Sequence, residues 1–238
     1  SDLEAVMTHN GAREIKENAV VQDLALKGFE TIGIACDVTD EPSVQALVQA
    51  AIAEWGRLDV AVNNAAIGDI IKPLPELSLS EWQRVINVNL TGAFLLAREA
   101  AQVMTAGGSV INIASQAAKT GFRQMAPYVS SKHGMIGLTR TSAIDLAPLG
   151  IRVNAVCPNH VTTTMGKAQS EYFSSLRGME PEAYRAQIAD RVPLGRVGRP
   201  EDTASAVAFL ASEDAAFITG EALNVSGEAL RSAMQDLV

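Results

Sequence analysis

The amino-acid sequence predicts a single doubly wound α/β domain over residues 1–238, with a parallel sheet as the middle of three layers. Two observations lead to this prediction. Short apolar runs rich in Val and Ile lack strict alternation, which is typical of strands buried on both faces. Stretches with helical spacing lie between these runs, and right-handed connections then place helices on both faces of the sheet.

Each element has its own signal in the sequence. Apolar runs predict strands at residues 31–36, 58–63, 108–114, 151–157 and 221–226. Helical spacing covers residues 42–55, 81–104, 128–146 and 200–211. Prolines or acidic residues in the first turn mark several of the helix starts. The region 158–199 follows a strand and shows neither pattern, so we expect an irregular lid over a ligand at the carboxyl end of the sheet.

The composition excludes some classes of function. The chain has 27 acidic residues against 19 Lys and Arg, and its net charge of −8 without a basic cluster argues against a nucleic-acid partner. No apolar run reaches the roughly 18 residues of a membrane span, and no secretory signal is visible, so we expect a cytoplasmic protein. Cys36 and Cys157 lie in apolar runs, which predicts buried reduced thiols and no metal site.

Tyr128 and Lys132 are the first candidates for chemistry. They lie four residues apart in a predicted helix, so their side chains share one face. Oxidising an alcohol needs a base that is partly ionised near neutral pH, whereas free tyrosine has a pKa of about 10. A cation one turn away stabilises the phenolate and lowers this pKa. We therefore interpret Tyr128 as a general acid/base whose pKa Lys132 lowers.

Nine motifs, in order over nearly the whole chain, resemble those of the short-chain dehydrogenases/reductases. They are "DVTD" (37–40), "NNAA" (63–66), "NVNLTG" (87–92), Ser115 after the strand "GSVINIA" (108–114), "YVSSK" (128–132), "NAVCPN" (154–159), "VTTTM" (161–165), "GRVGRPED" (195–202) and "FITGEALNVSG" (217–227). The resemblance implies a Rossmann-like fold and an NAD(P)-dependent enzyme acting on CH–OH groups.

The same resemblance completes the predicted catalytic set. Ser115 would bind the substrate oxygen opposite Tyr128 and stabilise developing charge there. Asn89 would hold, through its backbone, a water that connects Lys132 to solvent. Asn87 is the alternative on sequence alone, but the spacing to the glycine that ends "NVNLTG" favours Asn89.

A further set of residues is assigned to an NAD cofactor, with NADP possible. The set comprises Asp2, Asp37, Val38, Asn64, Ala65, Tyr128, Lys132, Pro158, Val161 and Thr163. In the family, the acid at Asp37 meets the adenine amino group, and the loop after Pro158 meets the nicotinamide. Asn63 and Asn64 are favoured as cofactor contacts over simple turn formers. Asp2 would bind the ribose hydroxyls and so favour NAD.

The residues around the predicted reaction centre suggest a polar substrate. Gln116, Asn159 and His160 would join Ser115 and Tyr128 in a pocket suited to a polyol, a sugar or a small diol. A 3-oxoacyl thioester is the alternative substrate, although no basic docking surface for an acidic carrier is visible. An alternative from a different functional class is a catalytically silent binding or scaffold protein. By analogy with the family, we expect a homotetramer.

The sequence also departs from the family pattern. The expected opening strand, glycine-rich turn and helix have no counterpart, so the first strand-helix-strand unit is expected to be missing, with "SDLEAV" as the end of the family's second strand. Two explanations stay open: the sequence omits part of a normal enzyme, or the protein lacks half of its dinucleotide site. Asn159 replaces a glycine after Pro158, at a position where positive φ is expected.

Overall fold

The computed structural model describes residues 5–9 and 14–227. Its strands are all parallel and form two groups. β1 (Ala5–His9) pairs with β2 (Thr31–Ala35). The second group has the order β3-β4-β5-β6, with bounds Val60–Asn63, Ser109–Ile113, Arg152–Pro158 and Ala222–Val225. The predicted parallel α/β arrangement is thereby confirmed.

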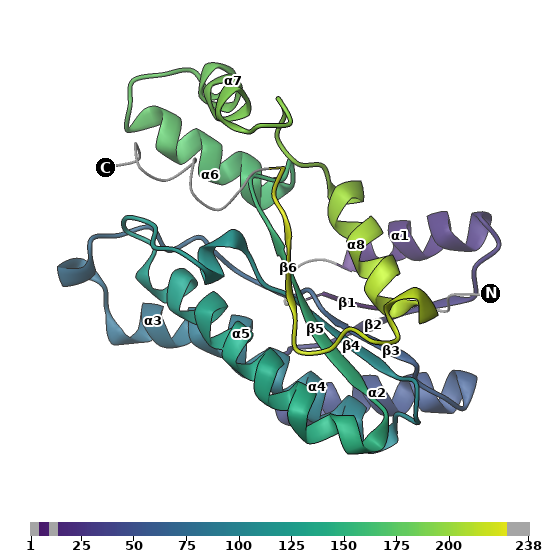
Figure 1. Cartoon of the computed structure of the whole chain (residues 1–238). Helices are drawn as coiled ribbons and strands as arrows, with labels where there is room; N and C mark the ends of the chain where they lie inside the picture. Colours follow the sequence, from purple (N-terminus) through teal and green to yellow (C-terminus); the bar gives the residue numbers. More distant parts are fainter. Residues whose placement is uncertain (1–4, 10–13, 228–238) are drawn as a thin grey trace.

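Helices cover both faces of the strands (Figure 1). α2 (Glu41–Trp55), α4 (Gly92–Val103) and α5 (Ala126–Leu146) lie on one side. α1 (Glu14–Leu26) and α8 (Pro200–Ala211) lie on the other. The tightest packing is in the middle of the sheet, where Val110, Ile111, Val153, Ala155 and Val156 are fully buried, because both faces of β4 and β5 are covered.

Two features of the predicted element order need correction. β1 extends to His9, beyond the strand end expected within "SDLEAV", and α1 was not predicted, since the segment after "AVMTH" carries no clear apolar period. The predicted helix 81–104 is divided into α3 (Leu79–Ile86), a π-helical segment (Asn87–Thr91) and α4. Asp2 lies outside the described residues.

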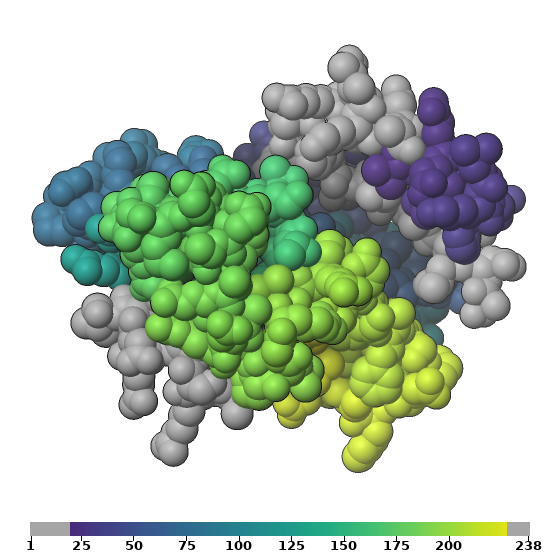
Figure 2. Space-filling view, turned by 90° about the horizontal axis from the view of Figure 1, so that it is seen from above, coloured from purple at the N-terminus to yellow at the C-terminus, as the bar shows by residue number. Residues whose placement is uncertain are grey.

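The region predicted to be an irregular lid is largely helical. Within the predicted region 158–199 the structure has α6 (Thr164–Ser175) and α7 (Pro181–Arg191). Thr163 caps α6 by accepting a hydrogen bond from the Gly166 backbone at 3.1 Å. α6 and α7 pack on each other beyond the carboxyl ends of β4 and β5, and Figure 2 shows them (green) from above.

The termini of α2 and α3 illustrate how local sequence defines the helices. Asp40 accepts a hydrogen bond from the Ser43 backbone at the start of α2, and Gly56 ends that helix with a φ of 73°, a conformation that favours glycine. Ser78 and Glu81 form a reciprocal capping box at the start of α3. Among the described residues, no helix is both long enough and apolar enough to cross a bilayer.

Candidate functional site

Ser115 lies just beyond β4, where the chain leaves the sheet. The neighbouring Ala114 donates its backbone N–H to the Val156 carbonyl at 2.8 Å, which ties the end of β4 to β5. Ser115 Oγ accepts a hydrogen bond from the Ala117 backbone at 3.1 Å and caps a short 3₁₀ turn. A half-buried hydroxyl is therefore fixed at the carboxyl end of a central strand, where open α/β sheets bind ligands.

Tyr128 and Lys132 lie one turn apart near the start of α5, as predicted. Lys132 is 2% exposed, and its Nζ donates to the Ile113 carbonyl at 2.7 Å. Nζ lies 5.7 Å from the centroid of the Tyr128 ring. The two side chains thus share a buried space, and the hydrogen bond to Ile113 connects them to the end of β4 beside Ser115.

Burial dominates the ionisation of this pair. It raises the pKa of the Tyr128 phenol, while contact with the Ser115 hydroxyl acts in the opposite direction. Burial also lowers the pKa of Lys132 to about 8. Burial therefore has the larger effect on Tyr128, whose pKa lies above its ordinary value, and the lowering of this pKa by Lys132 stays a prediction.

Asn89 is fully buried within the π-helical segment. Its Oδ1 accepts from the Ile67 backbone N–H at 2.8 Å, and its Nδ2 donates to the Ile67 carbonyl at 2.9 Å. The same Nδ2 lies 3.1 Å from the Ser131 hydroxyl, next to Lys132. The side chain of Asn89 therefore joins the loop after β3 to α5, whereas the sequence argument had concerned its backbone.

Gly68 is a site residue that sequence analysis missed. A Cβ at this position would lie 3.1 Å from Cδ2 of Tyr128 and 3.3 Å from Nε2 of Gln169 on α6. The loop, the tyrosine ring and α6 therefore meet around Gly68, with space for hydrogen but little for a methyl group. A glycine directly after Ile67, five residues after the predicted strand 58–63, was the available signal.

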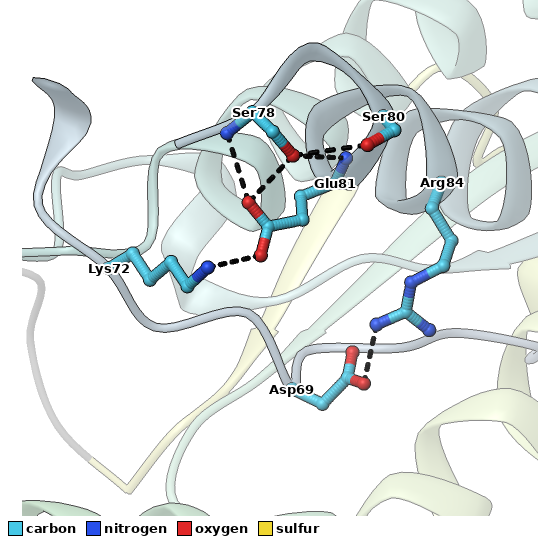
Figure 3. Close-up of polar contacts among 6 residues, drawn as sticks. All are labelled: Asp69, Lys72, Ser78, Ser80, Glu81 and Arg84. Atoms are coloured by element: carbon cyan, nitrogen blue, oxygen red, sulfur yellow. Dashed lines mark hydrogen bonds and ion pairs between the residues drawn. The ribbon is translucent and has the colours of Figure 1, made fainter. Parts of the chain in front are cut away.

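Two ion pairs hold the loop that begins at Gly68 (Figure 3). Arg84 on α3 pairs with Asp69 at 2.6 Å, and Lys72 pairs with Glu81. The hydrogen bonds of Glu81 with Lys72 and with Ser78 lower the pKa of its carboxyl to about 2. The start of α3 therefore anchors the loop that lies against Tyr128.

A buried polar ladder crosses the sheet below the site. Asn63 Nδ2 donates to Asn112 Oδ1 at 2.7 Å, and Asn112 Nδ2 donates to the Thr139 hydroxyl at 2.8 Å. Asn63 also donates to the Ala93 carbonyl at 3.2 Å. Its amide is thus engaged inside the protein, while Asn63 also lines the hollow that contains Asn64, so its contact with a cofactor stays a prediction.

A hollow of about 250 Å³ collects several of the predicted cofactor residues. Its lining includes Val38, Asn64 and Ala65. Asp37, which precedes Val38 in the chain, is exposed, although one carboxylate oxygen already accepts hydrogen bonds from the Thr39 backbone and hydroxyl at 2.9 and 2.7 Å. Apolar walls with an exposed amide and a carboxylate fit the adenosine half of a dinucleotide.

The loop after β5 differs from the sequence expectation. Asn159 is 7% exposed, and His160 is the residue with positive φ, at 42°. Val161 forms an isolated bridge with Gly198, and Thr163 caps α6. The left-handed conformation thus occurs one residue later than predicted, at a histidine, which is among the residues that tolerate it best.

Gln116 and His160, both predicted as substrate residues, lie in different surroundings. Gln116 is 2% exposed, and its Nε2 has no hydrogen-bond partner among the described residues. His160 lines a separate pocket with residues of α7, and burial lowers its pKa to about 4. Cys36 and Cys157 are both buried and free, as predicted. No group of three or more His, Cys, Asp or Glu side chains in the described ranges is arranged to hold a metal ion.

Comparisons with known proteins agree with this geometry. Residues 4–227 match the family described as enoyl-(acyl carrier protein) reductase. A relative named cis-4-hydroxycyclohexanecarboxylate dehydrogenase, from Sinomonas cyclohexanicum, is 40% identical over 210 residues, covering 87% of this chain and 80% of that protein.

Two solved structures have the same fold. The actinorhodin polyketide ketoreductase with NADPH gives a TM-score of 0.86 at 36% identity and covers 93% of this chain and 85% of its own. An NAD⁺-bound xylitol dehydrogenase gives 0.87 at 29% identity and covers 94% of this chain and 88% of its own. The matched family, the curated relative and the two structures together show that the chain belongs to the short-chain dehydrogenases/reductases, NAD(P)-dependent oxidoreductases that act on CH–OH groups.

Proposed function

We propose that the protein interconverts a secondary alcohol and its ketone with Tyr128 as the general acid/base. The observation that carries this proposal is the cluster in which Ser115 contacts Tyr128 and the buried Lys132 Nζ lies 5.7 Å from the tyrosine ring. When bound, the nicotinamide cofactor accepts the hydride from the alcohol carbon or returns it to the ketone. The hydroxyl proton passes to the phenolate oxygen of Tyr128 in oxidation and back in reduction.

The neighbouring residues have supporting roles in this proposal. Ser115 would hydrogen-bond the substrate oxygen from the side opposite Tyr128. Lys132, when protonated, would stabilise the phenolate and bind the nicotinamide ribose. Asn89 would hold the loop of Gly68 against the ring and supply the backbone site for a proton-conducting water. A π-helical segment supports the last role, because its altered hydrogen bonding frees backbone groups.

The proposed cofactor site extends from the hollow around Val38 to the loop after β5. Asp37, Asn64 and Ala65 would contact the adenosine half. Pro158, Val161 and Thr163 would contact the nicotinamide half. The structural neighbours hold NADPH in one case and NAD⁺ in the other, so we propose NAD with NADP as the alternative.

For the substrate, we propose a polyol, sugar or small diol, with a 3-oxoacyl thioester as the second candidate. The Nε2 of Gln116, beside Ser115, has no hydrogen-bond partner in the described part of the chain, which supports a polar substrate. The similarity to a xylitol dehydrogenase structure supports the first candidate, and the similarity to a polyketide ketoreductase supports the second. The region 158–199 would serve as the substrate lid of a single domain.

We also propose a homotetramer. Phe94 on α4 and Ile144 on α5 are 42% and 75% exposed, and Phe217 and Leu223 expose a second apolar area near β6. Two separate areas are what a tetramer with two kinds of interface requires. Size-exclusion chromatography with light scattering should give four times the chain mass, and a monomer would contradict the proposal.

The decisive experiment compares Tyr128→Phe with Tyr172→Phe. Tyr172 lies on α6, where its hydroxyl is 3.3 Å from Gln124 Oε1, so it controls for loss of a lid hydroxyl. The assay panel is xylitol, cis-4-hydroxycyclohexanecarboxylate and an acetoacetyl thioester, each with both nicotinamide cofactors. Tyr128→Phe should lose at least about 10³-fold in kcat yet keep cofactor binding by nicotinamide fluorescence. Retained turnover would refute the assignment. No turnover or cofactor binding by the unmodified protein would favour the scaffold alternative.

A further inference from the structure

A second pocket lies within the lid, apart from the residues of the proposed reaction centre. It has a volume of about 330 Å³, and α7, the turn after α6 and the loop after β5 form its walls. Its polar lining residues are His160, Arg177, Tyr184, Gln187 and Arg191. None of the described residues that line the pocket is acidic, although the chain as a whole has a net charge of −8.

The two arginines of this pocket differ from other arginines near them. Arg185 on α7 pairs with Glu182, and Arg196 pairs with Asp202 at 2.6 Å. Arg177 and Arg191 form no ion pair with any of the described residues. Two guanidinium groups without a carboxylate partner make the pocket electropositive.

Arg177 is held in place by contacts inside the pocket. Its guanidinium lies over the Tyr184 ring, 5.4 Å from the centroid, and its Nη1 is 3.4 Å from Gln187 Oε1. The charges of both Arg177 and Arg191 act on the Tyr184 hydroxyl, where they partly offset the rise in its pKa that burial causes. Both arginines line the same pocket as this phenol.

The uncharged groups of the pocket can also donate hydrogen bonds. Tyr184 is 4% exposed, and neither its hydroxyl nor the His160 ring is hydrogen-bonded to any of the described residues. Burial keeps His160 neutral at pH 7, so one ring nitrogen carries a proton and can donate. Two cations and two neutral donors around one cavity match an anionic ligand with several acceptor oxygens.

We propose that this pocket binds a carboxylate carried by the substrate, so that the enzyme acts on hydroxy acids and oxo acids. The inference rests on the proposed function. His160 supplies the connection, because it follows β5 by two residues and β5 is paired with β4, whose end carries Ser115. An alcohol carbon at Tyr128 and a carboxylate among the arginines would place the body of the substrate beneath the lid.

The first test measures binding without turnover. The melting temperature of the protein is followed with cyclohexanecarboxylate, its neutral analogue cyclohexanecarboxamide, and inorganic phosphate. Arg191→Gln removes one pocket cation, and Arg185→Gln removes a charge from the same helix outside the pocket. Cyclohexanecarboxylate should raise the melting temperature of the unmodified protein and of Arg185→Gln but not of Arg191→Gln. No carboxylate-dependent rise, or a rise with phosphate alone, would overturn the proposal.

The second test measures specificity. The kcat/KM for cis-4-hydroxycyclohexanecarboxylate is compared with that for its methyl ester. The unmodified enzyme should prefer the acid at least tenfold, and Arg191→Gln should lose this preference mainly through KM, whereas Arg185→Gln should keep it. Equal kcat/KM for acid and ester in the unmodified enzyme, or equal losses in the two variants, would overturn the proposal. If no alcohol is oxidised, the proposed function fails, and the binding test still decides whether the pocket takes a carboxylate.

Discussion

The polar groups near α5 and those of the lid pocket differ in their hydrogen bonding. Near α5, Lys132, Asn89 and Thr139 are buried, and each bonds to a protein partner. In the lid pocket, Tyr184 and Arg191 are hydrogen-bonded to none of the described residues. Satisfied buried groups fix one geometry, whereas groups without protein partners are available to a ligand. We infer that the first region defines the reaction and the second selects its substrate.

The largest expected effect comes from Lys132→Met, which separates activity from stability. The variant should lose about 10³-fold in kcat/KM, because the phenolate and the cofactor ribose lose their cation. It should not melt at a lower temperature, since a buried cation whose pKa is about 8 is replaced by an apolar chain of similar length. Lys119→Met, which removes a lysine bonded to the Ala222 carbonyl, is the control. Unchanged kcat/KM in Lys132→Met would contradict the proposed role.

The next largest effect should be a pH dependence of the free energy of unfolding that His160 causes. His160 has a pKa of about 4 in the folded protein and about 6.5 when unfolded, so the unfolded state takes up the proton first as the pH falls. The full contribution of His160 to stability is present above pH 6.5 and is lost between pH 6.5 and 4, up to about 3 kcal/mol. His160→Gln should lack this loss. Superimposable curves of unfolding free energy against pH for the two proteins would contradict the burial of His160.

Thr139→Val tests the buried ladder beneath the site. The substitution keeps the side-chain shape but removes the hydroxyl that accepts from Asn112, leaving a buried amide hydrogen unpaired. The free energy of unfolding should fall by about 2 kcal/mol in urea denaturation. Thr105→Val, at an exposed position, should change it little. Equal effects of the two substitutions would mean that the ladder does not stabilise the sheet.

The smallest of these effects is a geometric one at Gly68. In Gly68→Ala the new methyl group would press on the Tyr128 ring and on Gln169, so kcat/KM should fall about tenfold while the melting temperature changes little. Gly121→Ala is the matched control, because a Cβ there meets nothing within 4 Å. A similar kcat/KM in both variants would show that the contact with Tyr128 does not position the ring.

The sequence predicted the strands of the second group well because β3, β4, β5 and β6 are short apolar runs. It also placed Tyr128 and Lys132 on one face, since helical spacing alone determines that relation. It could not predict the direction of the Tyr128 pKa, which depends on how completely neighbouring segments exclude water. The hydrogen-bond partners of Asn63 and Asn89 could not be predicted either, because they come from segments distant in the chain.

The structure of the region 158–199 could not be predicted from the sequence in this way. Its helices were missed because neither α6 nor α7 has a continuous apolar face, and only parts of each are buried. Arg177 and Arg191 looked like scattered surface charges until the fold brought them to the same tyrosine. A specificity pocket of this kind has no sequence period, so its residues can be found only from the structure.

The π-helical segment between α3 and α4 makes the position of Asn89 depend on the number of residues between these two helices. Backbone angles remain helical from Ile86 to Gly92, so the two helices follow one another without a loop. Each residue turns a helix by about 100°. A one-residue deletion there would restore regular α-helix and rotate Asn89 away from Ile67. Homologous sequences should therefore tolerate substitutions in α3 more readily than gaps, and gap placement would indicate which homologues keep the loop against the tyrosine.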